Sequence, residues 1–503
     1  MALPKVLGIE TEYGILVRGG ESNPIAASSV LINAYVQELA RIGASTGATR
    51  VGWDFEDEHP GQDARGFDVG GSSPPEVETH LVNAVLTNGA RYYVDHAHPE
   101  LSTPECADPH TVVVYDRAAE LILQRSMRAA RALLPEGQEI VVYKNNSDRK
   151  GNSYGCHENY LMDRQVPFGK IVSNVMPHFI TRQIFTGAGK VGTEAAGLTS
   201  GDVPFQLTQR ADFFEEEVGL ETTLKRPIVN TRDEPHADPQ KYRRLHVIVG
   251  DANLSEVATF LKVGTTALVL SMIEDDWLTR DLVPARPVQA LRQVSYDLTL
   301  ARPIELADGS SITALEAQWE LHTRARKFAE ERGLDCIGGT EVGEQVLDRW
   351  EAVLGALETD PGQLADQLDW VAKHRLIDGY RERHGLRWDD ARLAAMDLQY
   401  HDLRPDRSLA ARVGLERLVT DAEAQRATTE PPEDTRAYFR GRCLQRWPSS
   451  IVAANWDSLV FDVGDDPLRR VPMMEPLRGT RAHVGSLLDG CESAADLLHQ
   501  LGQ

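Results

Sequence analysis

Cysteine is scarce in this sequence. The chain of 503 residues has five cysteines, which lie far apart: Cys106, Cys156, Cys336, Cys443 and Cys491. They form no CxxC pair and are odd in number, which argues against a disulfide framework and against a zinc ribbon. The few scattered thiols favour a reducing compartment, and none stands in a recognisable nucleophile motif.

Long apolar runs are missing as well. The longest apolar stretch, Phe260–Ile273, is interrupted by Lys262 and is too short to span a bilayer. Lys5, Glu10 and Glu12 break up the N-terminus before the apolar core of a signal peptide could form. We therefore expect a cytoplasmic protein with no membrane partner.

Positive charge is in deficit. The 53 lysine and arginine residues stand against 76 aspartate and glutamate residues, which gives a formal net charge of −23. Such a surface repels a polyanion, so we expect no nucleic-acid partner. The hydrophobic fraction of 42% and the charged fraction of 26% are those of an ordinary folded protein with a sizeable core.

The sequence does contain a mixture of strand-like and helix-like segments. Strands are predicted at Lys5–Ile15, from Arg91 onward, and at Glu139–Lys144, Gly155–Met162 and Arg243–Val249. Helices are predicted from Ser28 to Ile42 and at Glu76–Leu86, Ala118–Leu133, Ser255–Trp277, Ile312–Arg332, Glu344–Leu357 and Gln363–Arg375. Because the strands do not alternate regularly with helices, the pattern predicts an α+β fold. A polar, proline-marked break at Thr428–Glu433 predicts a boundary between residues 1–428 and a small C-terminal domain, residues 429–503.

Four of the predicted strands carry polar side chains at alternate positions, which places these side chains on one face of each strand. The sets are Glu10 and Glu12; Arg91, Tyr93 and Asp95; His157 and Asn159; and Arg244 and His246. We expect Pro99 to end the strand of Asp95, so that Glu100 and Thr103 lie just beyond it.

These residue types suit a particular chemistry. Carboxylates bind Mg²⁺, which bridges phosphates, and arginine neutralises phosphate as a bidentate donor. A sheet that presents all four sets on one face could therefore hold a cation and a phosphate chain. For any single strand, the alternative is a half-solvated sheet whose outer face is simply polar.

The same segments carry a family resemblance. The motifs Gly8–Gly14, Arg91–Asp95 with His98–Glu100, Gly155–Asn159 and Arg244–His246 resemble those of the Pup ligase/depupylase family, within the carboxylate–amine ligase superfamily of glutamine synthetase. The resemblance covers essentially the whole chain. It implies a glutamine synthetase-like fold: a curved, mainly antiparallel sheet cradle packed with helices, plus a small C-terminal domain.

A long polar insert separates the first helix from the Arg91 strand. Residues 43–75 carry seven glycines and few apolar side chains, so the insert cannot form a core of its own. Its Asp63–Asp68 segment resembles a loop of the depupylase branch that the ligases lack. The resemblance thus implies hydrolysis at the C-terminal residue of the ubiquitin-like protein Pup: deamidation of a terminal glutamine and cleavage of the isopeptide bond to a substrate lysine. We expect the insert to be mobile and to lie near the cradle.

Carried over residue by residue, the resemblance also implies a site. Asp95 is the expected catalytic residue, and the expected Mg²⁺ ligands are Glu10, Tyr93, Glu100, His157 and His246. The expected nucleotide contacts are Arg91, Thr103, Asn159, Arg244 and Trp456. Glu12 is either a further ligand or a support for one, and Arg210 is either a contact to a substrate carboxylate or a plain surface arginine.

The implied cofactors are Mg²⁺ and ATP, or ADP plus phosphate, with the nucleotide required but not consumed at each turnover. The implied partners are Pup, pupylated proteins and the bacterial proteasome system. Asp95 can act either as a nucleophile or as a general base. Two rival functions stay open: an ATP-dependent Pup–protein or related glutamate–amine ligase, and a docking subunit of the proteasome system whose cradle is inactive.

Overall fold

A six-stranded antiparallel sheet lies at the centre of the computed structural model, which describes residues 2–21, 23–41, 51–56, 58–68, 82–464 and 467–502. The strand order is β13-β8-β1-β6-β5-β4. The strands are β1 (Leu7–Glu12), β4 (Asn83–Val85), β5 (Arg91–Asp95), β6 (His98–Ser102), β8 (Cys156–Asp163) and β13 (Tyr242–Val247). The mainly antiparallel α+β architecture expected from the sequence is confirmed.

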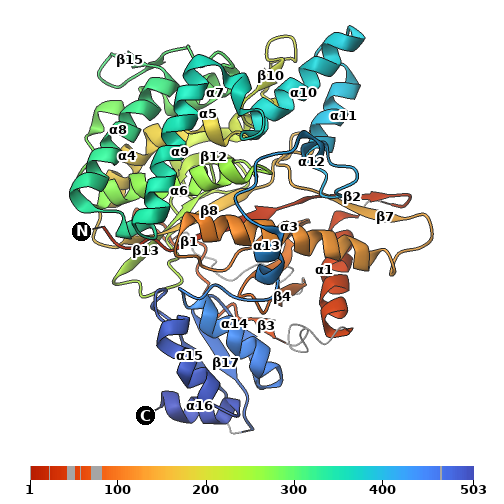
Figure 1. Ribbon diagram of the computed structural model, residues 1–503, viewed down its shortest axis with the longest axis vertical. Helices are drawn as coiled ribbons and strands as arrows, with labels where there is room; N and C mark the ends of the chain where they lie inside the picture. Colours follow the sequence, from red (N-terminus) through yellow and green to blue (C-terminus); the bar gives the residue numbers. More distant parts are fainter. Residues whose placement is uncertain are drawn as a thin grey trace.

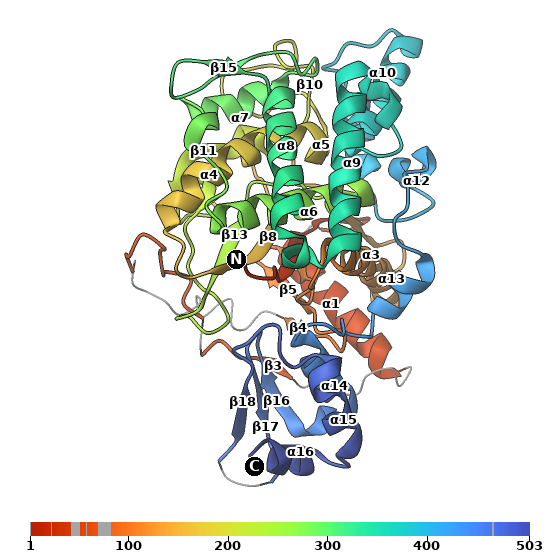
Figure 2. The same cartoon turned by 60° about the vertical axis from the view of Figure 1, so that its left-hand side comes forward.

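Helices cover one face of this sheet, and many of them extend from it toward the top of Figures 1 and 2. They are α1 (Pro24–Arg41), α3 (Pro109–Ala130), α4 (Phe168–Thr181), α5 (Gln183–Thr186), α6 (Glu256–Glu274), α7 (Pro287–Tyr296), α8 (Ala314–Arg332), α9 (Thr340–Thr359), α10 (Asp369–His384), α11 (Ala391–Tyr400), α12 (Leu409–Val413) and α13 (Asp421–Ala427). Leu7, Ile9 and Tyr160 of the sheet share one hydrophobic cluster with α6. Although α6 is long and apolar enough to cross a membrane, it is wholly buried here as a core helix.

Paired short strands extend the structure beyond the central sheet. They are β2 (Gly14–Arg18) with β7 (Glu139–Tyr143), β9 (Lys190–Val191) with β10 (Phe205–Gln206), β11 (Phe214–Gly219) with β12 (Arg226–Asn230), and β14 (Ile304–Glu305) with β15 (Ser311–Ile312). The β11–β12 pair is parallel and the others are antiparallel.

The C-terminal segment forms a smaller unit, at the bottom of both views (Figures 1 and 2). It contains α14 (Ala437–Arg446), β16 (Ile451–Ala454), β17 (Ser458–Phe461), β18 (Arg469–Pro472), α15 (Arg481–Gly490) and α16 (Ala494–Leu501). These elements share a hydrophobic cluster of their own, which includes Phe439, Trp447, Phe461 and Leu497. The exact boundary at residues 428 and 429 stays a prediction.

Part of the insert belongs to this smaller unit. Strand β3 (Gly52–Trp53) joins the sheet β18-β17-β16-β3 and pairs in parallel with β16. Farther along, the buried Asp63 accepts a hydrogen bond of 2.6 Å from the hydroxyl of Thr231, which directly follows β12. The described part of the insert therefore lies at the cradle, as expected; residues 43–50, 57 and 69–75, and with them the expected mobility, lie outside the described residues.

Four helix predictions need correction. The helix predicted at Ala118–Leu133 starts at Pro109, because Asp108 caps it and a proline suits the first helical position. The helix predicted at Gln363–Arg375 runs from Asp369 to His384. The helix predicted at Glu76–Leu86 is wrong where the structure describes it, because Asn83–Val85 forms the edge strand β4 against β5. Pairing and the burial of Val85 override a weak helical period there. The first helix starts at Pro24, four residues before Ser28, because the side chain of Asn23 accepts a hydrogen bond from the Ala26 backbone and a proline suits the first helical position.

Candidate active site

The polar face of the central sheet gathers the predicted side chains. In the strand register Glu10 lies opposite His157, Glu12 lies opposite Glu100, and His246 lies opposite Asn159. The alternation read from the sequence is thus confirmed: Ile9 and Thr11 of β1 point into the core, whereas Glu10 and Glu12 are only half-buried on the other face.

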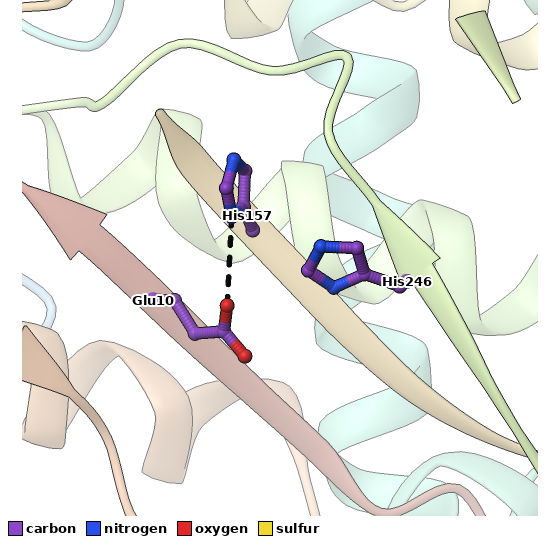
Figure 3. A group of neighbouring side chains, drawn as sticks. All are labelled: Glu10, His157 and His246. Atoms are coloured by element: carbon purple, nitrogen blue, oxygen red, sulfur yellow. Dashed lines mark ion pairs between the residues drawn. The ribbon is translucent and has the colours of Figure 1, made fainter. Parts of the chain in front are cut away.

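Glu10, His157 and His246 form one compact cluster (Figure 3). Their potential ligand atoms all lie within 4.8 Å of one another, and the Glu10 carboxylate lies 3.5 Å from Nδ1 of His157. Burial would raise the pKa of Glu10, but the contact with His157 and the charge of Arg244 outweigh it and hold that pKa well below its usual range. Glu10 is therefore an anion that faces two imidazoles.

His246 is prepared to bind a metal ion. Its Nδ1 is held by two neighbours: it lies 3.1 Å from the amide oxygen of Asn159 and 3.2 Å from the guanidinium of Arg244. Its buried Nε2 has no hydrogen-bond partner among the described residues. Burial lowers the pKa of His246 well below its usual value, so the ring is neutral. A neutral imidazole oriented through its other nitrogen is the form that ligates metals, so the donor set fits a divalent cation.

A second cluster contains Glu12, Asp95 and Glu100, whose carboxylate oxygens also lie within 4.8 Å of one another. Burial, followed by the charges of Asp95 and Glu12, raises the pKa of Glu100 well above its usual value. Tyr93 donates a hydrogen bond of 2.7 Å to Glu100, and its own pKa is raised by burial, so it is a neutral phenol that supports this carboxylate. Mutually repelling buried carboxylates are the arrangement that a bound cation relieves.

Asp95 lies at the end of a tight hairpin. The chain turns at His96 and Ala97, and β6 then runs back along β5 with Asp95 opposite His98. The expectation that Pro99 ends the strand is therefore wrong. Pro99 lies inside β6, where its missing N–H is tolerated and its carbonyl accepts a hydrogen bond of 3.0 Å from the backbone of Tyr13. This turn places Glu100 directly opposite Tyr93.

The side chain of Asp95 lines a large cleft with a volume of about 1140 Å³. The cleft is lined by residues that include Glu12, Asp95, His157, Arg210, Arg226 and Arg292. Burial opposes ionisation of Asp95, but the hydrogen bond and charge of His96, together with the charges of His157 and Arg91, keep the pKa of Asp95 below its usual value. The group is thus an ionised carboxylate at an accessible cavity wall.

A separate pocket runs along the same sheet on the side of the C-terminal unit. Four of the five predicted nucleotide contacts line it, namely Thr103, Asn159, Arg244 and Trp456, and Glu10 lies beside them. The same wall includes Glu105, His236 and Arg436, which the sequence analysis missed. His236 lies two residues after Glu234, an alternation that could have drawn attention to it; burial lowers its pKa to about 4.

Arg91 is not among the described residues that line this pocket. Its guanidinium group lies between the rings of Trp53 and Tyr93, 3.9 Å from each ring centroid, and 3.7 Å from the carboxylate of Glu58. Trp53 in turn packs edge-to-face on Trp456, which does line the pocket. Arg91 therefore lies one side chain away from the pocket wall.

Arg210 is not a surface residue. It is buried at the cleft wall, and it donates hydrogen bonds to the hydroxyl of Ser153 and to the carbonyls of Ile248 and Gly250. Arg226, which the sequence analysis missed, lies beside it and donates a hydrogen bond of 2.7 Å to the carbonyl of Ser153. Neither guanidinium forms an ion pair with a carboxylate of the described residues, and burial lowers the pKa of Arg226 to about 10. The cleft thus contains two positively charged side chains that suit an anionic group of a substrate.

A family model described as Pup-ligase protein matches residues 5–460. The chain belongs to the Pup-ligase protein family. Among curated members of this family, a depupylase of Acidothermus cellulolyticus is 55% identical over 99% of this chain and 99% of that protein. A Pup deamidase/depupylase of Mycolicibacterium smegmatis is 48% identical over 99% of this chain and 100% of that protein. A Pup–protein ligase of Nakamurella multipartita is 42% identical over 83% of this chain and 94% of that protein.

Solved structures of the family confirm the fold. The Pup ligase PafA in complex with Pup matches with a TM-score of 0.78 and 32% identity, over 97% of this chain and 91% of that one. A structure of PafA in complex with ADP matches with a TM-score of 0.74 and 35% identity, over 83% of this chain and 90% of that one.

Proposed function

We propose that this protein is a Pup deamidase and depupylase. It hydrolyses the side-chain amide of a C-terminal glutamine of Pup, and it cleaves the isopeptide bond between Pup and a substrate lysine. One observation carries this choice over the ligase: depupylases are 48–55% identical to it over essentially the whole chain, whereas the ligase likeness covers 83% of the chain at lower identity.

The nucleotide, ATP or ADP plus phosphate, occupies the pocket between the sheet and the C-terminal unit. Thr103, Asn159, Arg244 and Trp456 contact it there, and the ADP complex of PafA, a family member of the same fold, supports this assignment. Arg91 approaches the nucleotide from beside Trp53. We place the boundary of the C-terminal domain at residue 429, so that this pocket lies where the two domains meet.

Mg²⁺ is held by Glu10, His157 and His246, and by Glu100 with Tyr93 as its neighbour. The unpartnered Nε2 of His246 and the crowded carboxylates support this assignment. A bound Mg²⁺ ion supplies positive charge that neutralises phosphate and stabilises a developing oxyanion.

Asp95 performs the amide chemistry. Its ionised carboxylate faces the cleft, where it attacks the amide carbonyl carbon or removes a proton from the attacking water. Arg210 and Arg226 bind a carboxylate of the terminal residue, because both lie in the same cleft without an anionic partner among the described residues. Binding a free carboxylate in this way would select the C-terminal residue of the substrate.

The proposal places the enzyme in the cytoplasm, alongside Pup, pupylated proteins and the bacterial proteasome system. It is tested by incubating the protein with glutamine-ended Pup, Mg²⁺ and nucleotide and following the mass of Pup. Conversion of the terminal amide to a carboxylate is the expected result. Unchanged glutamine-ended Pup, together with ADP release coupled to amide formation when glutamate-ended Pup and a protein amine are supplied, would favour the ligase instead.

A further inference from the structure

The turn beside Asp95 contains a strained residue. His96 is the first residue of the two-residue connection between β5 and β6, and its φ is +50°. Only glycine adopts this left-handed region readily, and two-residue hairpin turns that need it usually contain glycine or asparagine. The turn is also anchored, because the hydroxyl of Ser28 in α1 donates a hydrogen bond of 2.9 Å to the carbonyl of Ala97.

The side chain of His96 folds back toward the preceding residue, Asp95. Nδ1 of His96 lies 2.8 Å from Oδ2 of Asp95, and both residues line the large cleft. The His96 side chain is 58% exposed and the Asp95 side chain is 30% exposed. An ion pair this exposed contributes little to folding stability, so it does not compensate for the strained backbone. Strain of this kind that persists beside a reactive group is an indication of function.

We propose that His96 is a positioning residue that fixes the carboxylate of Asp95 for reaction. The N–H of its ring holds Oδ2, which stops rotation of the carboxylate and leaves Oδ1 to face the substrate in the cleft. The positive φ is what turns the imidazole back onto the preceding residue. This inference rests on the proposed role of Asp95 in amide hydrolysis.

Two substitutions separate the hydrogen bond from the backbone conformation. His96→Gly accommodates the positive φ without strain but has no donor side chain. His96→Asn also tolerates this conformation and retains an N–H donor. We expect kcat for deamidation of glutamine-ended Pup to fall at least about 10-fold in His96→Gly, the effect of losing one hydrogen bond to a charged group, and to stay within about threefold of wild type in His96→Asn. KM for Pup and nucleotide affinity should not change in either variant.

Asp276→Gly is the matched control, since Asp276 is a second exposed residue with positive φ and does not line the cleft. It should retain the wild-type kcat. A His96→Gly enzyme with unchanged kcat, or a His96→Asn enzyme as slow as His96→Gly, would overturn the inference while leaving the proposed function intact. A wild-type enzyme that fails to deamidate Pup would instead contradict the proposed function itself.

Discussion

Four acidic side chains, Glu10, Glu12, Asp95 and Glu100, lie close together on the polar face of the sheet. Their environments differ. The pKa values of Glu10 and Asp95 lie below their usual values because of nearby imidazoles and arginines, whereas burial and the neighbouring carboxylates raise that of Glu100. At the scale of single residues, these opposite shifts separate the ionised groups, which we propose bind the metal or react, from Glu100, whose ionisation a bound cation would favour.

The role of Asp95 can be tested by a substitution that replaces one carboxylate oxygen with an amide nitrogen. Asp95→Asn keeps the size of the side chain but removes the charge that a nucleophile or a base requires. We expect deamidation and depupylation to fall at least about 100-fold while nucleotide still binds. The measurement is a steady-state rate with a parallel nucleotide titration. A rate within a few-fold of wild type would make Asp95 a structural residue.

The role of Glu10 concerns the metal. Glu10→Ala leaves His157 and His246 without their anionic neighbour and removes one proposed oxygen ligand. We expect Mg²⁺-dependent nucleotide affinity to fall at least about 10-fold, in line with the loss of more than 1.4 kcal/mol of binding. Isothermal titration calorimetry with and without Mg²⁺ measures this. Wild-type affinity in a folded Glu10→Ala protein would contradict the assignment.

At the scale of elements, helix α14 joins the C-terminal unit to the segment that follows β6. Arg436 and Arg440 of this helix region both form ion pairs with Glu105, which follows the proposed nucleotide contact Thr103 by two residues. The guanidinium of Arg440 also donates a hydrogen bond of 3.0 Å to the carbonyl of Trp456. One partly buried acidic side chain thus connects the central sheet to a tryptophan that lines the proposed nucleotide pocket.

This junction predicts a pH dependence of stability. Burial would raise the pKa of Glu105, but the two arginines lower it from 4.5 to about 2. Because the folded-state pKa is depressed, the stabilisation is fully present above pH 4.5 and disappears as the pH falls toward 2. Its size is about 3 kcal/mol from the shift.

Thermal unfolding of wild type and Glu105→Gln across this pH range measures the effect. The wild-type protein should lose its advantage over Glu105→Gln as the pH falls. A stability difference between the two proteins that stays constant with pH would show that Glu105 contributes no such linkage.

Sequence patterns predicted the strands of the central sheet better than the turns that connect them. Alternation in β1, β5, β8 and β13 placed Glu10, His157 and His246 on one face, because a strand has a fixed period of two. The same reasoning misplaced the turn at Pro99, because a two-residue turn built on a histidine with positive φ carries no glycine or asparagine signal. It also missed Glu105, since its partners lie more than three hundred residues away in the chain.

At the scale of the whole molecule, two spaces open along the polar face of the sheet. The proposed nucleotide pocket lies toward the C-terminal unit, and the cleft with Asp95 and the two arginines opens elsewhere along the same polar face. Glu10 lines the pocket and Glu12 lines the cleft, although they are two residues apart on β1. The insert strand β3 completes the smaller unit and brings Trp53 against Arg91 and Trp456. The proposed sites for the nucleotide and for the amide substrate would thus be neighbours along the same strand, β1.

The central claim is that this architecture cleaves Pup from its conjugates. The most direct measurement incubates a purified Pup–protein conjugate with the enzyme, Mg²⁺ and nucleotide, and follows the conjugate, free protein and ADP together, with Asp95→Asn as the control. We predict that wild type converts the conjugate to free protein and Pup without stoichiometric ADP release, and that Asp95→Asn does not. A conjugate that persists, or new conjugate made from free Pup and protein with one ADP released per bond, would contradict the claim.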